Sequence, residues 1–173
     1  MVDTLYLRLL CEDDFAFIYN LYCEKSQIYW SGHSEEPKEE SLLKWFNNLL
    51  MDPHVVPYII SNGSERVGFC RLKIHVNNKE ICEGFPFSIS ERFRNRGYAT
   101  KAISLLINEA RFKFGIRYMY DWVLDTNEAS KKVFLRNGFR QTGRTREQFI
   151  PLEGKNILMH EYILDVRMGA IEQ

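Results

Sequence analysis

The stretch from Phe85 to Ala110 constrains the fold most, because a strand pattern changes there into a helix pattern across a short basic loop. Residues 85–90 alternate between apolar and small side chains, which predicts a strand. From position 99 onward apolar residues recur at helical spacing, which predicts an amphipathic helix that opens near Gly97. Two arginines and a glycine lie between the two elements, in the order Arg94-Asn95-Arg96-Gly97-Tyr98-Ala99.

This loop has the features of an anion-binding site. The first N–H groups of a helix have no partner within the helix, and they carry the positive end of its dipole. A glycine lets a phosphate approach the backbone closely, and flanking arginines add positive charge. We therefore interpret the loop as a pyrophosphate-binding site. A strand–turn–helix corner with solvated arginines is the alternative, because short glycine motifs also occur by chance.

Length and composition predict a single domain, residues 1–173, with a complete hydrophobic core. Hydrophobic residues make up 45% of the chain, so we expect it to fold without disulfides or metals. Lys and Arg together number 23, as do Asp and Glu, so the formal net charge is zero. This balance argues against a nucleic-acid-binding protein, because such proteins need a basic face.

The cysteines also argue against a metal site. Cys11, Cys23, Cys70 and Cys82 form no CxxC pair and have no histidine cluster beside them. We expect reduced thiols in a cytoplasmic protein, with Cys70 and Cys82 buried on strands. The sequence shows neither a charged-then-apolar leader nor a long apolar run, so no membrane association is expected.

Turn signals and periodicity divide the rest of the chain into a mixed α/β order. Pro86 cannot donate to a sheet ladder, so a bulge or splay is expected there. The segment 26–40 is expected to be irregular, and Asn62-Gly63 to form a hairpin turn. Other strands are expected at residues 5–9, 55–61, 66–76, 118–124, 139–149 and 157–166, and helices at 12–22, 39–50 and 127–137. These elements predict a mixed, mostly antiparallel sheet of about seven strands, flanked by about four helices.

Two sets of residues carry a resemblance to a known family. The loop residues Arg94, Gly97 and Ala99 are followed, one helix and one strand later, by Asn127, Ser130, Phe134, Gly138 and Phe139. The first set resembles the R/Q-x-x-G-x-G/A acetyl-CoA loop of the Gcn5-related N-acetyltransferases, the GNAT superfamily. The second set is similar to the later N-x-x-A/S helix of that family, with its aromatic residue and G-F ending. The resemblance covers most of the chain and implies the GNAT fold, with a splay after the acetyl-CoA strand.

The ends of the chain are similar to one branch of this superfamily. The opening Leu-x-Leu-Arg strand and residues 146–149 resemble the enzymes that acetylate ribosomal-protein N-termini, and their polyamine-acetylating relatives. This likeness implies a direct transfer of acetyl from acetyl-CoA to a primary amine, with a protein N-terminus as one candidate acceptor. Acetylation of a polyamine or an aminoglycoside is the alternative, as is a non-catalytic acetyl-CoA-binding module. A homodimer is also expected, since dimers are common in this branch.

The resemblance also implies where acetyl-CoA binds. Backbone groups of Phe87, Ser88 and Ile89 would pair with pantetheine like an added strand. Asn127 would contact the pantetheine arm. The pyrophosphate would be held by residues of the loop and the first helical turn, namely Arg94, Asn95, Arg96, Gly97, Tyr98, Ala99 and Thr100. The 3′-phosphate would meet one of three cations that otherwise form a solvated helix face, namely Lys131, Lys132 and Arg136.

One position departs from the family pattern and affects the expected acid. Many members protonate the leaving sulfur with a tyrosine, where this chain has Phe134, which has no proton to donate. Ser130, one turn earlier, is the candidate for a hydrogen bond to the sulfur. Its alternative role is to help cap its own helix. A thiolate can also leave at neutral pH without an acid.

Glu147 is the best candidate for the general base, by resemblance to a carboxylate in the same branch. An exposed ion pair with Arg144 or Arg146 is its alternative role. Glu83, just before the loop strand, is a second candidate, and burial would raise the pKa of either carboxyl. His160 lies in an apolar strand and is interpreted as a packed core histidine.

The acceptor is expected to bind between the segment 26–40 and the final hairpin, because the family builds its acceptor wall there. Trp30 and four glutamates in this segment would suit a polycation or a basic peptide, namely Glu35, Glu36, Glu39 and Glu40. We favour the alternative that these glutamates belong to a solvated loop and to the start of a helix.

Overall fold

The structure, a computed structural model, describes residues 4–167. Its strands form one sheet: β1 (Leu5–Leu9), β2 (Val55–Asn62), β3 (Glu65–His75), β4 (Asn78–Cys82), β5 (Phe87–Ile89), β6 (Tyr118–Leu124), β7 (Arg140–Ile150) and β8 (Lys155–Asp165). The order is β1-β2-β3-β4-β6-β8-β7, and β5 pairs with β3 beside this path. The pairing of β4 with β6 is parallel and the other pairings are antiparallel. The predicted mixed, mostly antiparallel sheet is therefore confirmed.

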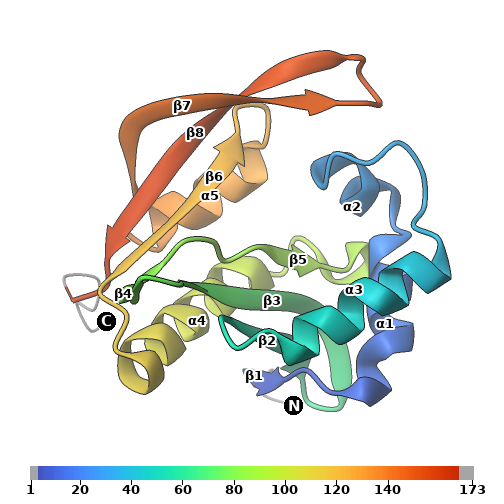
Figure 1. Ribbon diagram of the computed structural model, residues 1–173, viewed down its shortest axis with the longest axis horizontal. Helices are drawn as coiled ribbons and strands as arrows, with labels where there is room; N and C mark the ends of the chain where they lie inside the picture. Colours follow the sequence, from blue (N-terminus) through green and yellow to red (C-terminus); the bar gives the residue numbers. More distant parts are fainter. Residues whose placement is uncertain (1–3, 168–173) are drawn as a thin grey trace.

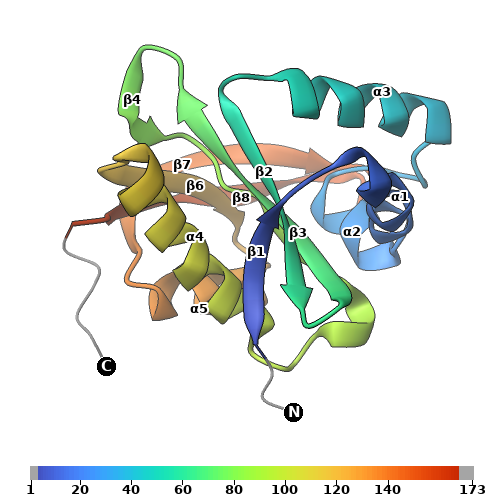
Figure 2. The same ribbon diagram turned by 90° about the horizontal axis from the view of Figure 1, so that it is seen from below.

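Helices cover both faces of the sheet (Figures 1 and 2). They are α1 (Phe15–Tyr22), α2 (Lys25–Trp30), α3 (Glu39–Met51), α4 (Tyr98–Phe114) and α5 (Glu128–Arg136), with short 3₁₀ turns η1 (Glu12–Asp14) and η2 (Glu91–Phe93). α4 and α5 bury Leu106 and Phe134 in the larger core. α1 and α3 pack Ile18 and Phe46 against Phe69 on the opposite face. Burial of these apolar side chains from both sides is the main stabilising contribution to the fold.

Most predicted elements are confirmed, with bounds that differ by a few residues. The hairpin at Asn62-Gly63 joins β2 to β3, and β6 spans the predicted residues. The sheet has one more strand than expected, because β4 forms a separate strand before β5. There is also one more helix, because the segment 26–40 is not wholly irregular but contains most of α2.

The sheet divides at the predicted splay near Pro86. Only two residue pairs join β4 to β6, Ile81 with Tyr118 and Cys82 with Met119. Beyond them β6 leaves with β8 and β7, while β5 stays paired with β3 (Figure 1). One edge of β5 therefore has no strand beside it among residues 4–167. Such an edge presents backbone N–H and C=O groups that a ligand can pair with.

α2 bridges the two sides of this division. On one side Ser88 Oγ donates to Gln27 Oε1 at 2.7 Å, and Ser26 Oγ donates to Glu91 Oε1 at 2.6 Å. On the other side Tyr29 donates its hydroxyl hydrogen to Glu153, in the turn of the β7–β8 hairpin. Trp30 packs against the apolar cluster of that hairpin. A helix this short has little stability of its own, so these tertiary contacts explain why the local pattern missed it.

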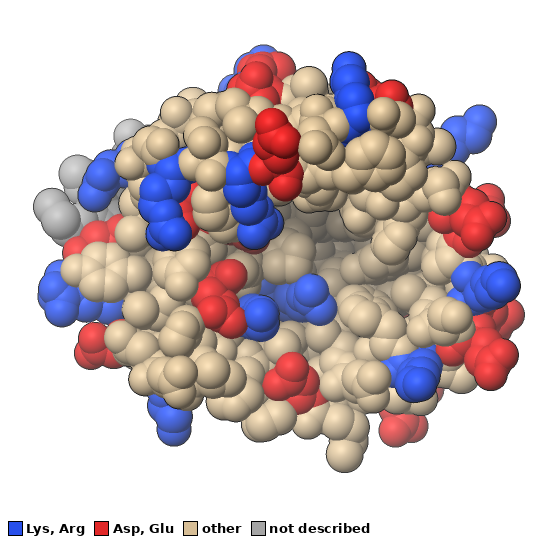
Figure 3. Space-filling model, turned by 45° about the horizontal axis from the view of Figure 1, so that its top comes forward, with Lys and Arg blue, Asp and Glu red and all other residues tan. Residues whose placement is uncertain are grey.

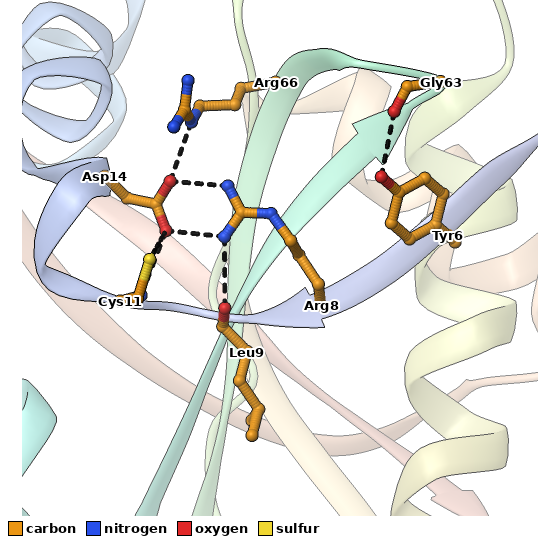
Figure 4. Close-up of polar contacts among 7 residues, drawn as sticks. All are labelled: Tyr6, Arg8, Leu9, Cys11, Asp14, Gly63 and Arg66. Carbon is orange, nitrogen blue, oxygen red and sulfur yellow. Dashed lines mark hydrogen bonds and ion pairs between the residues drawn. The ribbon is translucent and has the colours of Figure 1, made fainter.

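A buried carboxylate fixes the first strand to the first helices (Figure 4). Asp14 accepts hydrogen bonds from Arg8 at 2.6 and 2.7 Å and from Arg66 Nε at 2.7 Å. Burial alone would raise the pKa of Asp14, but these bonds, with one from the Cys11 backbone, hold that pKa well below its usual range. The carboxylate therefore stays ionised and ties β1, β3 and η1 together, away from the splay.

Candidate active site

A cavity of about 330 Å³ lies between β5, the start of α4 and α5. The structure gathers around it all the predicted coenzyme residues except Arg96, namely Phe87, Ser88, Ile89, Arg94, Asn95, Gly97, Tyr98, Ala99, Thr100, Asn127 and Ser130. Two of the three candidate cations for the 3′-phosphate, Lys132 and Arg136, also line it. We call this space the coenzyme cavity. The neighbouring segments β5 and the start of α4 form one part of its wall, and α5 and α2, which are distant in the sequence, complete it.

The loop before α4 has the backbone geometry that an anion site needs. Gly97 is the N-cap residue of α4, with φ +76°, and no side chain caps the helix there. Asn95 also has a positive φ, of 61°. Arg94 donates from Nε to the Ile89 carbonyl oxygen at 2.9 Å, which joins the loop to β5. Arg96 instead lies over the Phe93 ring, with Cζ 5.6 Å from the ring centroid, and does not line the cavity.

The start of α5 settles one alternative for Ser130. The helix is capped by Asn127, whose side chain accepts from the Ser130 N–H at 3.0 Å. The Ser130 hydroxyl is therefore not the cap, and this residue lines the cavity. Lys131 forms ion pairs with Asp125 at 2.9 Å and Glu128 at 3.0 Å, and it does not line the cavity.

A second cavity, of about 400 Å³, adjoins the first across the splay. We call it the acceptor cavity. The two share six lining residues, namely Gln27, Trp30, Phe87, Ser88, Asn127 and Ser130. All three tryptophans of the chain, Trp30, Trp45 and Trp122, line the acceptor cavity. Figure 3 shows a deep hollow on one face of the molecule, with both basic and acidic side chains around it. The shared residues mark the place where two ligands can meet.

Among residues 4–167, only two charged side chains line the acceptor cavity, Asp121 and Arg71. The Asp121 oxygens accept from the backbone N–H groups of Phe85 at 2.9 Å and Trp122 at 2.7 Å. Burial raises the pKa of the Asp121 carboxyl, although these two hydrogen bonds lower it in part. The carboxylate lies where the two halves of the sheet separate, and it accepts the backbone N–H of Phe85, which precedes β5. It is a partly desolvated acid–base group within the cavity wall.

The carboxylates predicted from sequence lie elsewhere. Glu147 is exposed on β7, accepts from Asn156 Nδ2 at 3.1 Å, and lines neither cavity. Glu83 lies 3.0 Å from Lys73 Nζ and lines neither cavity. His160 is partly buried, and its Nε2 lies 3.2 Å from an oxygen of Asp125. The four glutamates of the segment 26–40 are exposed and also line neither cavity.

Phe134 is buried in an aromatic cluster at the bottom of the splay. Its ring lies 5.1 Å from Phe85, 5.0 Å from Phe139 and 5.3 Å from Tyr162, measured between ring centroids. The ring therefore packs the base of the acceptor cavity. Ser130 is the only hydroxyl-bearing side chain among residues 4–167 on the α5 part of either cavity wall.

Other kinds of site have no support in residues 4–167. No group of three or more His, Cys, Asp or Glu side chains is placed to hold a metal ion. No helix in this part of the chain combines the length and the apolar character needed to cross a membrane. Cys70 and Cys82 are buried, and burial raises the pKa of both thiols, to about 12 for Cys82. Neither is activated as a nucleophile.

Sequence reasoning missed three residues of the site. Asp121 interrupts an otherwise apolar and aromatic strand, and that interruption was the available signal. Arg71 is a charge within a strand whose neighbours are buried, a similar signal. Gln27 had no signal, because it reaches both cavities only through the tertiary placement of α2.

Gly68 allows β5 to lie close to β3, and a Gly68→Ala substitution is expected to disturb the coenzyme cavity. A Cβ there would lie 2.3 Å from the Ser88 carbonyl oxygen, so β5 would have to move. We expect a loss of about 1–3 kcal/mol in the free energy of unfolding, together with weaker acetyl-CoA binding. Urea denaturation and calorimetric titration measure both effects. Gly84→Ala is the control, because its Cβ would have no neighbour closer than 4.0 Å. Equal stability and affinity in the two variants would contradict this prediction.

Comparison with known proteins identifies the family. Residues 4–140 match the model of the acetyltransferase (GNAT) domain. A search of curated proteins found no match. The fold is similar to spermidine N-acetyltransferase from Vibrio cholerae in complex with CoA and spermine, at a TM-score of 0.83 and 18% identity over 92% of this chain and 94% of that chain. A dodecameric form of the same Vibrio cholerae enzyme has a TM-score of 0.77 and 21% identity, covering 94% of each chain.

An aminoglycoside acetyltransferase in complex with coenzyme A is also similar, with a TM-score of 0.76 and 15% identity over 94% of this chain and 95% of that chain. At such low identities these structures show the shared fold, and the predicted GNAT fold is confirmed. The domain match covers most of the chain, which shows the family independently of the structures. The chain therefore belongs to the acetyltransferase (GNAT) family and is an acetyl-CoA-dependent N-acetyltransferase, as the sequence predicted.

Proposed function

We propose that this protein transfers an acetyl group to the primary amine of a small molecule. One observation carries the proposal: a cavity with an anion-binding loop meets an aromatic cavity at six shared residues. The similar solved enzymes are named for spermidine and for aminoglycosides. These names favour the small-molecule alternative over a protein N-terminus, and they do not support the ribosomal branch.

Acetyl-CoA supplies the activated acetyl group, and the coenzyme cavity suits its shape and charge. The free edge of β5 is the proposed partner of the pantetheine amides. The first backbone N–H groups of α4, after Gly97, are the proposed donors to the pyrophosphate. Lys132 and Arg136 are the proposed partners of the 3′-phosphate, because both line the cavity. Arg96 contributes charge near the loop without lining the cavity.

The enzyme must also remove a proton from the acceptor ammonium, and Asp121 is our proposed base. It lines the acceptor cavity, and each of its oxygens keeps a second lone pair beside the backbone hydrogen bond that it accepts. Burial raises its pKa toward the range in which a carboxylate can take a proton from an amine. Glu147, the base predicted from sequence, stays a candidate that would have to reach the amine from outside the cavity.

Ser130 is the proposed donor to the leaving sulfur. It lies at the junction of the two cavities, and its hydroxyl is not used as a helix cap. Phe134 cannot serve, and it packs among aromatic rings instead. The predicted homodimer stays a prediction, and one structural neighbour is a dodecamer.

A thiol-release assay with acetyl-CoA tests the proposed function. The panel contains small primary amines, spermidine, an aminoglycoside and a peptide with a free N-terminus. We expect at least one small amine to raise release well above the rate without acceptor, and the peptide to give a lower kcat/KM. Faster turnover of the peptide would overturn the small-molecule assignment, and no acceleration by any amine would overturn the transferase proposal.

A further inference from the structure

Arg71 presents an unpaired positive charge to the acceptor cavity. It lies on β3 opposite Pro86, whose carbonyl oxygen accepts from the Arg71 backbone N–H at 3.2 Å. Successive side chains of a strand alternate between its faces, so Arg71 shares the α1–α3 face with Phe69. Its Cζ lies 5.7 Å from the centroid of the Trp45 ring. The guanidinium is thus placed by β3 and α3 together.

Among residues 4–167 this guanidinium forms no ion pair with a carboxylate. The Arg71 Nε is buried and has no hydrogen-bond partner, and within residues 4–167 no carboxylate lies within ion-pair distance of Arg71. Asp121 shares the cavity, and the charge of Arg71 lowers its pKa in part, but the two side chains form no ion pair within 4.0 Å. Buried polar groups are normally paired, so an orphan in a cavity wall indicates a partner supplied by a ligand. A planar guanidinium suits a carboxylate in particular, because it can donate two parallel hydrogen bonds.

The rest of the cavity does not suit a polycation. Asp121 is the one carboxylate among the described lining residues, and it is balanced by Arg71. Aromatic and other apolar residues are the majority of the lining residues, including Tyr22, Trp45, Phe69 and Trp122. A ligand with several positive charges would meet Arg71 without enough acidic groups to compensate. A ligand with one amine, one anionic group and an apolar body would match the charges and the walls.

From these contacts we propose that the acceptor is a small amine that also carries a carboxylate and an apolar or aromatic group, and that Arg71 binds the carboxylate. This inference deepens the proposed function and rests on it, because it names the class of molecule that occupies the acceptor cavity. The amine would then lie toward Asp121 and the shared residues Ser88 and Ser130, and the carboxylate toward Trp45. Amino acids with large side chains have this combination of groups.

Binding of a non-reacting probe tests the inference without turnover. Because all three tryptophans line the acceptor cavity, intrinsic fluorescence reports its occupancy. The protein, saturated with coenzyme A, is titrated with 3-phenylpropanoate, with its neutral amide, and with spermidine. We expect the carboxylate to bind about 10- to 100-fold more tightly than the amide, as for a charge-assisted hydrogen-bonded pair. Spermidine should bind more weakly than the carboxylate.

Two variants locate the effect. Arg71→Gln is expected to abolish the preference for the carboxylate over the amide, and Arg71→Lys to keep part of it because a positive charge remains. Arg140→Gln is the matched control, since Arg140 is exposed on β7 and lines neither cavity. It should keep the full preference. Thermal melting confirms that each variant is folded, and the comparison of ligands on the parent protein does not depend on any variant.

Several results would overturn the inference. They are no saturable response to 3-phenylpropanoate, equal affinity for the carboxylate and the amide, a preference that survives in Arg71→Gln, or tighter binding of spermidine. A failure of the proposed function gives a different set of results from a failure of this inference. If no amine is acetylated while the Arg71-dependent preference is present, the anion site stands and the transferase proposal fails. If spermidine is acetylated and the preference is absent, the transferase proposal stands alone.

Discussion

A Gly97→Glu variant is expected to bind acetyl-CoA about 100-fold more weakly than the parent protein, from the loss of charge-assisted hydrogen bonds to the pyrophosphate. Gly97 has φ +76°, a conformation that costs a residue with a Cβ about 1–2 kcal/mol. It is also the N-cap residue of α4, so a carboxylate there would lie beside the N–H groups proposed to receive the pyrophosphate. Strain and repulsion both act at the same point. Isothermal titration calorimetry with acetyl-CoA measures the change.

Gly63→Glu separates binding from backbone strain. Gly63 also has a positive φ, of 57°, and a Cβ added at either glycine would meet no atom within 4 Å. The control therefore carries the same charge and a similar strain in the β2–β3 hairpin, at a residue that does not line the coenzyme cavity. It should lose a similar amount of stability and keep the parental affinity. If Gly97→Glu is folded and binds acetyl-CoA as tightly as Gly63→Glu, the proposed pyrophosphate site is wrong.

An Asp121→Asn variant is expected to lower kcat by about 100- to 1,000-fold, a typical contribution of a positioned base. Asn keeps an oxygen that can accept from the Phe85 N–H, so the splay should persist. Because burial raises the pKa of Asp121, the parent enzyme should lose activity as the pH falls through a value above the ordinary aspartate pKa of about 4. The variant should lack this acidic limb. Steady-state rates across pH, with the acceptor found in the panel, provide the measurement.

Glu147→Gln distinguishes the two candidate bases. Glu147 is exposed and bonded to Asn156, so its replacement should leave the rate and the pH profile close to those of the parent. Circular dichroism and acetyl-CoA binding show whether each variant keeps its fold. A large rate loss in Glu147→Gln with a parental rate in Asp121→Asn would make Glu147 the base and leave Asp121 a positioning residue at the splay.

The coenzyme side of the molecule could be predicted because its information is local. A strand, a loop and a helix follow one another within residues 85–114, and their patterns meet at Gly97. The structure places the predicted loop residues around one cavity, apart from Arg96. The Arg96 guanidinium instead lies over Phe93, a contact that depends on the η2 turn and leaves no periodic trace in the sequence.

The acceptor side could not be predicted in the same way, because its walls come from eight separate helices and strands. α2 depends on hydrogen bonds to residues about 60 positions away, such as Ser88 and Glu91. The roles of Asp121 and Arg71 depend on which strand pairs end at the splay, and strand pairing is a long-range property. The position of Glu147 was inferred from resemblance alone. It pairs with Leu158 of β8, beyond a register shift between Gln141 and Thr145 that the sequence pattern does not reveal.

The narrow junction between β4 and β6 also bears on how selectivity can change. Two residue pairs join the halves of the sheet there, whereas seven pairs join β6 to β8. α2 provides a further connection across the gap between the halves, through the hydrogen bond from Tyr29 to Glu153. Evolution or engineering can therefore change the size of the amine that is admitted by altering the contact between Tyr29 and Glu153. Neither residue lines either cavity, so the residues shared by the two cavities would be unchanged.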